Sequence, residues 1–142
     1  MTNESQWGGV QSLLIAVEQG DADAQYVLGA MFAFGQGAPQ DDAQAVKWYR
    51  KAAEQGHALA QFNLGYRYLK GEGVAQDLVF AYALFILVAA GGNEDAMKGK
   101  IILVDVLPNA NKEEGERIAG QWQVGTPLPD KSSSAQVLDS DK

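Results

Sequence analysis

The chain has 142 residues, which is room for one compact domain or a short repeat array, and 46% of them are hydrophobic, as in ordinary globular proteins. It contains no cysteine, which excludes disulfide bonds, thiolate metal sites and a cysteine nucleophile. The net charge of −7 is uneven, because residues 1–46 contain no lysine or arginine. Since a nucleic-acid-binding protein needs a continuous cationic face, we expect no nucleic-acid partner. The acidic N-terminal end instead favours a basic protein partner.

The first predicted element is a leading helix over residues 5–19, which Gly8 and Gly9 weaken near its start. No secretory signal is visible, because the first nine residues have neither a basic nor an apolar region. The most apolar stretch, residues 78–90, is too short to span a bilayer, which takes about 20 residues. We therefore expect a soluble protein, cytoplasmic with this N-terminus or periplasmic if an export signal has been removed from it.

Residues 16–41 recur 36 positions later in the chain. Thirteen of these 26 positions are identical at that shift, among them the small residues Gly29 and Gly65. A third, degraded copy follows at the same shift and fades after Ala96. Such a period indicates a solenoid, in which each unit stacks on its neighbour and the last unit decays because one face meets water. The repeated small residues are predicted to let neighbouring helices approach closely.

Each unit is predicted to be a pair of helices. The first helices cover residues 21–34 and 57–70, where apolar residues recur at helical spacing, and each ends at a Gly-x-Gly turn. The second helices cover residues 43–55 and 78–90, and an aspartate that can cap the N-terminus precedes each of them.

A closing helix is predicted over residues 112–122, after a break at Pro108. The helix over 78–90 is apolar all round and must be covered on every side. The closing helix would do this with Ile118 and Trp122. If it does not, helix 78–90 exposes a patch that is suited to a partner or a homodimer.

All predicted elements are helices, so the fold class is all-α. Residues 1–123 form one solenoid domain. Residues 124–142 are rich in proline, serine and aspartate and have no sustained apolar period, so we expect a disordered tail there.

The sequence offers no catalytic site that we would assign. His57 is the one histidine, so a Ser-His-Asp triad or a two-histidine metal site cannot form within the chain, and its place in the turn between units favours a structural role. The Gly-x-Gly turns lack the Gly-Lys-Ser/Thr of a phosphate loop. We expect no metal, no cofactor and no enzymatic activity. The rival hypothesis, an enzyme or small-ligand binder, requires Asp23, Asp42 or Glu94 to meet in a deep cleft.

The stretch 53–77, AEQGHALAQFNLGYRYLKGEGVAQD, resembles a nearly complete Sel-one-like repeat (SLR), the 36-residue relative of the tetratricopeptide repeat, and residues 17–41 follow the same pattern. The resemblance spans about residues 10–100, and residues 101–122 resemble the closing segment of such proteins. It implies a right-handed α-α superhelix of two clear repeats and one degraded repeat, with capping helices at both ends. SLR proteins act as adaptors in bacterial and eukaryotic complexes and in immunity against secreted toxins, and few are enzymes.

The candidate partner-binding residues lie on the first helix of each pair, which lines the concave face in superhelical repeats. They form one stripe and its copy in the next unit: Val27, Ala30, Phe34, Asn63, Tyr66 and Lys70. Aromatic and mixed polar residues in a groove are typical binding anchors, and packing between repeats is the alternative. We therefore predict a bacterial adaptor that holds a protein or peptide in this groove. An immunity protein that neutralises a secreted toxin is the alternative within the same class.

Overall fold

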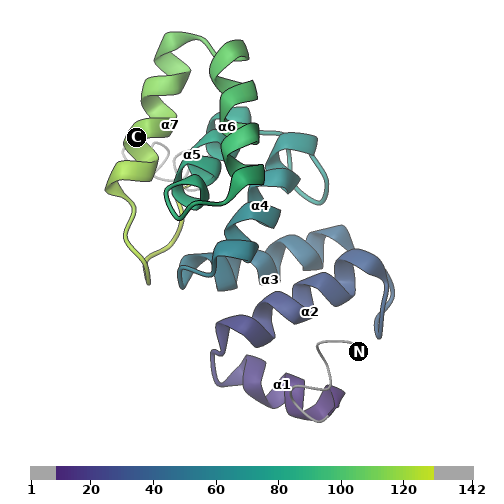
Figure 1. Ribbon diagram of the computed structural model, residues 1–142. Helices are drawn as coiled ribbons and strands as arrows, with labels where there is room; N and C mark the ends of the chain where they lie inside the picture. The colour runs from purple at the N-terminus through teal and green to yellow at the C-terminus, as the bar shows by residue number, and fades with distance from the viewer. Residues whose placement is uncertain (1–8, 130–142) are drawn as a thin grey trace, which may run out of the picture.

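The computed structural model describes residues 9–129, and the regular structure within that range is entirely helical. Its helices are α1 (Val10–Glu18), α2 (Ala22–Phe34), α3 (Asp42–Glu54), α4 (Ala58–Lys70), α5 (Leu78–Ala89), α6 (Glu94–Val106) and α7 (Asn109–Gln121). They stack in chain order from α1 at the bottom of Figure 1 to α6 and α7 at the top. The all-α prediction is confirmed. Residues 5–8 of the predicted leading helix lie outside the described range.

The helix pairs α2–α3 and α4–α5 are held together by the repeated glycines. A Cβ atom placed on Gly29 would lie 2.8 Å from the ring of Tyr49, and one on Gly65 would lie 3.0 Å from the ring of Phe85. Both distances are shorter than ordinary van der Waals contacts, so a side chain at either position would press on the facing ring. The role predicted for the small repeated residues is confirmed at these two positions.

Side-chain caps recur at the same place in successive units. The first helix of each unit begins with a side chain that accepts a hydrogen bond from the backbone N–H three residues later, and these caps are Asp21, His57 and Asn93. Asp41 and Asp77 cap α3 and α5 in the same way, as the sequence predicts. The 36-residue period therefore sets the positions at which helices begin, even in the third unit, where most residue types differ from those of the first two.

The third unit closes differently from the first two. Residues 35–41 and 71–77 link the two helices of the earlier pairs, whereas only Leu107 and Pro108 link α6 to α7. After this short turn α7 packs against α5 and makes few contacts with α6. A Cβ atom on Gly115 would lie 2.6 Å from the ring of Tyr82, so glycine is again required where α7 crosses α5.

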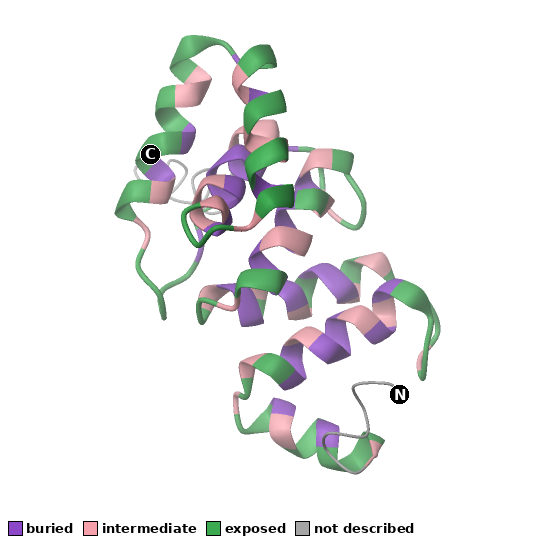
Figure 2. Ribbon diagram, in the orientation of Figure 1, coloured by how far each residue is buried: buried purple, intermediate pink, exposed green. Residues whose placement is uncertain are grey.

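Because α7 covers α5, the apolar helix is enclosed within the chain. Phe80, Tyr82 and Phe85 are buried, and Ile118 of α7 is buried in the same core, with Trp122 packed against it. The predicted cover is confirmed, and the alternative of a homodimer through residues 78–90 is wrong because its aromatic side chains are not accessible. Figure 2 shows the buried residues gathered along the inner sides of the stacked helices. None of the helices in the described range is long and apolar enough to cross a membrane.

Part of the predicted C-terminal tail packs on the domain. Leu128 is buried, and its backbone N–H donates to a carboxylate oxygen of Glu54 at 2.8 Å. The N–H of Gly125 donates to the carbonyl of Glu54 at 2.7 Å. Residues 124–129 therefore run back along the end of α3, where we expected the tail to begin. Residues 130–142 lie outside the described range.

Candidate functional site: the outward face of the first helices

The predicted stripe on α2 is only partly at the surface. Val27 is buried in the small core that α1 and α2 share, with a side chain only 6% exposed, so its assignment to an open groove is wrong. Ala30 is half-buried. Phe34, in the last turn of α2, is 71% exposed and is the most exposed large hydrophobic side chain in the described range. Of the three residues, Phe34 alone offers a large side chain to a partner.

The copy of the stripe on α4 contains one fixed and two accessible side chains. The amide of Asn63 donates to the carbonyl of Leu59 at 2.9 Å and to the hydroxyl of Tyr26 at 3.4 Å, which holds it against the helix. Tyr66 is 42% exposed. The ammonium group of Lys70 lies 5.7 Å from the centre of the Tyr66 ring, a cation–π distance. Tyr66 and Lys70 thus form a joint aromatic and cationic surface.

The stripe continues on α6, where the sequence pattern did not single it out. The residues 36 positions after Asn63, Tyr66 and Lys70 are Gly99, Ile102 and Val106. Ile102 and Val106 are both exposed. Few residues are identical between the copies after Ala96. The equivalent positions still lie on the outward side, because α6 is the first helix of its unit. Both residues can be found from the sequence by applying the 36-residue shift to the positions of the stripe, without requiring identical residue types.

His57 has no free ring nitrogen for chemistry. Its Nδ1 atom accepts from the N–H of Ala60, so we assign the ring proton to Nε2, which lies 2.8 Å from Oδ1 of Asp23. The ring also stacks on Tyr26 with centroids 4.8 Å apart. This arrangement ties the start of α4 to α2. The predicted structural role of the histidine agrees with these contacts.

The acidic residues of the first two units are used in caps and ion pairs. Asp42 accepts from the guanidinium of Arg67 at 2.9 Å, and Asp23 pairs with His57. Asp23 and Asp42 start α2 and α3, at opposite ends of that helix pair, while Glu94 starts α6. They do not meet in a cleft, and the described residues contain no group of three histidine, aspartate or glutamate side chains that could hold a metal ion. The predicted stripe itself contains no acidic residue, so it gives no support to the expectation of a basic partner.

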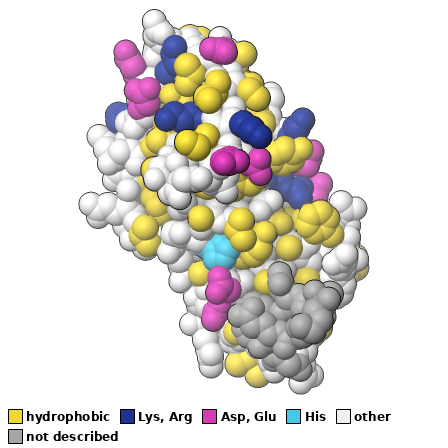
Figure 3. All heavy atoms as spheres, in the orientation of Figure 1, with side chains coloured by type: hydrophobic (Ala, Val, Ile, Leu, Met, Phe, Trp, Pro, Cys, Tyr) yellow, Lys and Arg dark blue, Asp and Glu magenta, His cyan; other side chains and the backbone are white. Residues whose placement is uncertain are grey.

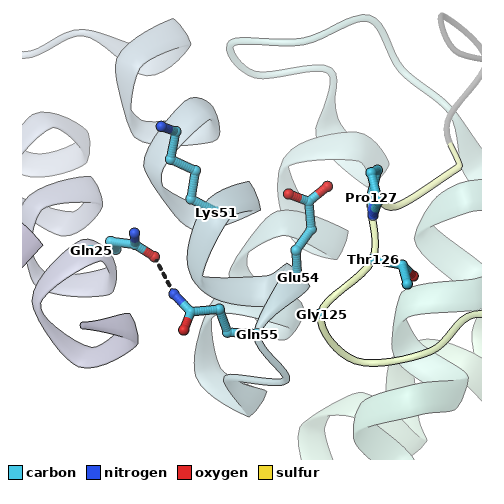
Figure 4. Close-up of a pocket in the computed structure, with 7 residues that line it drawn as sticks. All are labelled: Gln25, Lys51, Glu54, Gln55, Gly125, Thr126 and Pro127. Carbon is cyan, nitrogen blue, oxygen red and sulfur yellow. Dashed lines mark hydrogen bonds between the residues drawn. The ribbon is translucent and has the colours of Figure 1, made fainter. Parts of the chain in front are cut away.

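An open cleft of about 380 Å³ lies where the C-terminal segment meets α3. It is lined by Gln25, Lys51, Glu54, Gln55, Gly125, Thr126 and Pro127. Figure 4 shows the bond from the Gln55 amide to the Gln25 oxygen, 2.8 Å long, at its wall. Glu54 is bonded to the N–H of Leu128. The polar groups of this cleft thus join α2, α3 and the C-terminal segment, and they form no acid–base pair.

Two buried tyrosines have perturbed acidity but belong to the core. Burial raises the pKa of Tyr49 to about 12, and the neighbouring Tyr26 adds to the effect while Arg67 opposes it. Burial also raises the pKa of Tyr82, with a further rise from Glu116, to which its hydroxyl donates. Both phenols stay neutral at physiological pH. They serve packing rather than proton transfer.

The repeat itself decides the family. The family model described as Sel1 repeat matches residues 22–57 and 58–93, together just over half of the chain. The chain belongs to the Sel1 repeat family. Sel1 repeat proteins are generally protein–protein interaction scaffolds and are typically not enzymes. The two matched segments each join a first helix to the second helix that follows it, which is the pairing that Gly29 and Gly65 hold together.

Two solved structures are similar to this Sel1 repeat chain. A crystal structure of a Sel1 repeat protein from Oxalobacter formigenes is 42% identical, with a TM-score of 0.62 over 63% of this chain and 68% of that one. The structure of c5321, a protective antigen of uropathogenic Escherichia coli with an SLR fold, is 29% identical, with a TM-score of 0.77. That match covers 97% of this chain but 29% of c5321, so the present chain spans under a third of its length. No curated protein matches the sequence.

Proposed function

We propose that this Sel1 repeat chain is an adaptor that holds a partner protein or peptide on the outward faces of α2 and α4. The observation that carries the proposal is the exposure of Phe34 and Tyr66 on the first helices of successive units. Large aromatic side chains are among the commonest binding hot spots because they bury much apolar area with little loss of conformational entropy. Both residues stand where the two copies of the repeat differ, so the frame does not require them.

The geometry around Tyr66 supports a binding role rather than a packing role. Lys70 covers one side of its ring, which restricts the ring before a partner arrives. Asn63, one turn earlier on α4, is held by Leu59 and Tyr26 and keeps the neighbouring surface fixed. A partner would therefore meet a preformed surface with two aromatic anchors and one cation.

Site-specific photo-crosslinking tests the proposal. A photoreactive amino acid replaces Phe34 or Tyr66 in the full chain, which is expressed in its native cell and irradiated. The matched control carries the same group at Lys47, an exposed position of α3 beside Trp48. We expect one partner to be crosslinked from positions 34 and 66 and not from 47. Equal yields from all three positions, or a partner captured only from 47, would contradict the proposal.

Adaptor and immunity roles differ in the affinity that the same surface must supply. An adaptor that holds an extended segment is expected to bind at micromolar concentration, whereas neutralising a secreted toxin requires tight binding to a folded enzyme. Titration of the crosslinked partner against the chain, followed by calorimetry, separates the two. We favour the adaptor role because the exposed aromatic anchors, Phe34 and Tyr66, are few and lie on two helices, which suits a small interface. A sub-nanomolar complex with a folded enzyme would instead establish the immunity role.

A further inference from the structure

One helix carries an unusual share of the exposed hydrophobic surface. The exposed large hydrophobic side chains of α6 are Met97, Ile101, Ile102 and Val106. Ile101 and Ile102 are each 63% exposed. Figure 2 shows the outward side of α6 exposed over most of its length, and Figure 3 shows hydrophobic side chains gathered in the same upper part of the molecule, with lysine or arginine among them. A surface of this kind on one helix indicates an interaction site.

The surface is open because the third unit lacks the helix contact of the first two. Ile101 occupies the position of Gly29 and Gly65, which lie 72 and 36 residues earlier and where glycine admits the second helix of the unit. A branched side chain at this position prevents the same close approach. In agreement, α7 packs on α5 instead and makes few contacts with α6. The side of α6 that would be sealed in an ordinary unit is therefore left at the surface.

Two opposite charges lie in the middle of this surface. Lys98 and Asp105 are both exposed, and they are seven residues apart, which is two helical turns or about 10.5 Å along the axis. Met97 and Ile101 flank this pair on one side, and Ile102 and Val106 flank it on the other. Neither charge has an ion-pair partner among the described residues. The two charges are equally far from the midpoint between Ile101 and Ile102.

We propose that a second copy of this chain covers α6, with the two α6 helices antiparallel about a two-fold axis between Ile101 and Ile102. In this arrangement Lys98 of each copy faces Asp105 of the other, so one symmetry operation creates two ion pairs. The isoleucines meet their own copies at the axis, and Met97 packs beside Ile101 of the second copy. Such a surface is self-complementary, which is the requirement of a two-fold interface.

The charges select the register and the apolar residues supply the attraction. Exposed ion pairs contribute little to affinity on their own, but like charges face to face disfavour other registers. One helix on each side buries less than the roughly 1,200 Å² that is the lower end of stable interfaces. The dimer is therefore weak and forms at micromolar or higher concentration. The proposed interface is centred on α6, whereas Phe34 and Tyr66 lie on α2 and α4.

Sedimentation velocity of the full chain tests the proposed dimer. The concentration runs from low micromolar to about millimolar, the range in which weak complexes form. We expect the wild-type chain to pass from monomer to dimer, and Ile101→Asp to stay monomeric. Lys98→Asp and Asp105→Lys should each weaken association by about tenfold or more, because each places two like-charge pairs at the interface. The double exchange Lys98→Asp with Asp105→Lys restores the opposite charges and should recover the wild-type association.

Matched controls and contrary outcomes keep the test decisive. Ile15→Asp removes a comparably exposed hydrophobic side chain from α1 and should leave association unchanged. Circular dichroism of each variant verifies that it remains helical. A wild-type chain that stays monomeric at the highest concentration overturns the proposal. So does a double exchange that fails to recover association, or an equal loss of association in Ile15→Asp. None of these results bears on the crosslinks from positions 34 and 66.

Discussion

The first two units and the third begin from the same repeat but end in different packing. In α2–α3 and α4–α5 a glycine lets the second helix lie against the first, and the pair is closed. In the third unit Ile101 occupies that position, α7 moves onto α5, and α6 keeps an open hydrophobic side. A first helix is therefore closed by its own unit where a glycine faces the second helix, and it stays open in the unit where Ile101 occupies that position.

The largest expected effect on stability comes from placing isoleucine at the glycine position of the second unit. Gly65→Ile would place a branched side chain where even a Cβ atom lies 3.0 Å from the Phe85 ring. We expect the free energy of unfolding to fall by about 3 kcal/mol or more, at the upper end for overpacked cores. The reverse change, Ile101→Gly, lies on an exposed face and should cost about 1 kcal/mol or less. Urea denaturation of both variants measures the contrast, and equal losses would refute the role of this position.

The caps of the second and third units give the next largest contrast. Asp77 is buried and caps α5 at the centre of the core, whereas Asn93 is half-buried and caps α6 at its edge. Asp77→Ala should therefore lower the free energy of unfolding by about 2 kcal/mol, and Asn93→Ala by about 0.5–1 kcal/mol, the range measured for helix caps. Thermal melting of the two variants orders them. A larger loss in Asn93→Ala would mean that the third unit is as tightly packed as the second.

Tyr49 and Phe85 occupy equivalent positions in the first two units, but only the tyrosine can lose a proton at high pH. The pKa of Tyr49 rises from 10.0 to about 12 on folding, so the folded state retains a proton that the unfolded state releases. The stabilisation this provides is complete below pH 10 and is lost as pH rises toward 12. Tyr49→Phe, which makes the first unit like the second, should therefore lose less stability between pH 9 and 11.5. Urea midpoints measured across that range check it, and parallel curves for both proteins would contradict the assignment.

The sequence predicts the frame well because helix contacts and caps depend on few residue types at fixed spacing. Gly29, Gly65, Asp41 and Asp77 each have a local physical role, so their positions alone locate the pairs and their ends. The cover of α5 by α7 also follows, because a helix that is apolar all round has to be enclosed.

The surface is predicted less well because exposure depends on packing between distant segments. Val27 and Phe34 share one predicted stripe, yet α1 buries the first while the second stays open. The open face of α6 depends on where α7 goes after Pro108, which no local pattern states. Leu128 packs beside Glu54, 74 residues earlier, although its neighbours have the composition of a tail.

We propose that the repeated residues build the frame and that Phe34 and Tyr66, where the repeats differ, bind the partner. The most direct test is the double variant Phe34→Ser/Tyr66→Ser, assayed for affinity to the crosslinked partner and for thermal melting. We predict a loss of affinity of about 100-fold or more, as for two hot-spot residues, with the melting temperature nearly unchanged. Unchanged affinity, or a loss of affinity accompanied by a large drop in melting temperature, would contradict it.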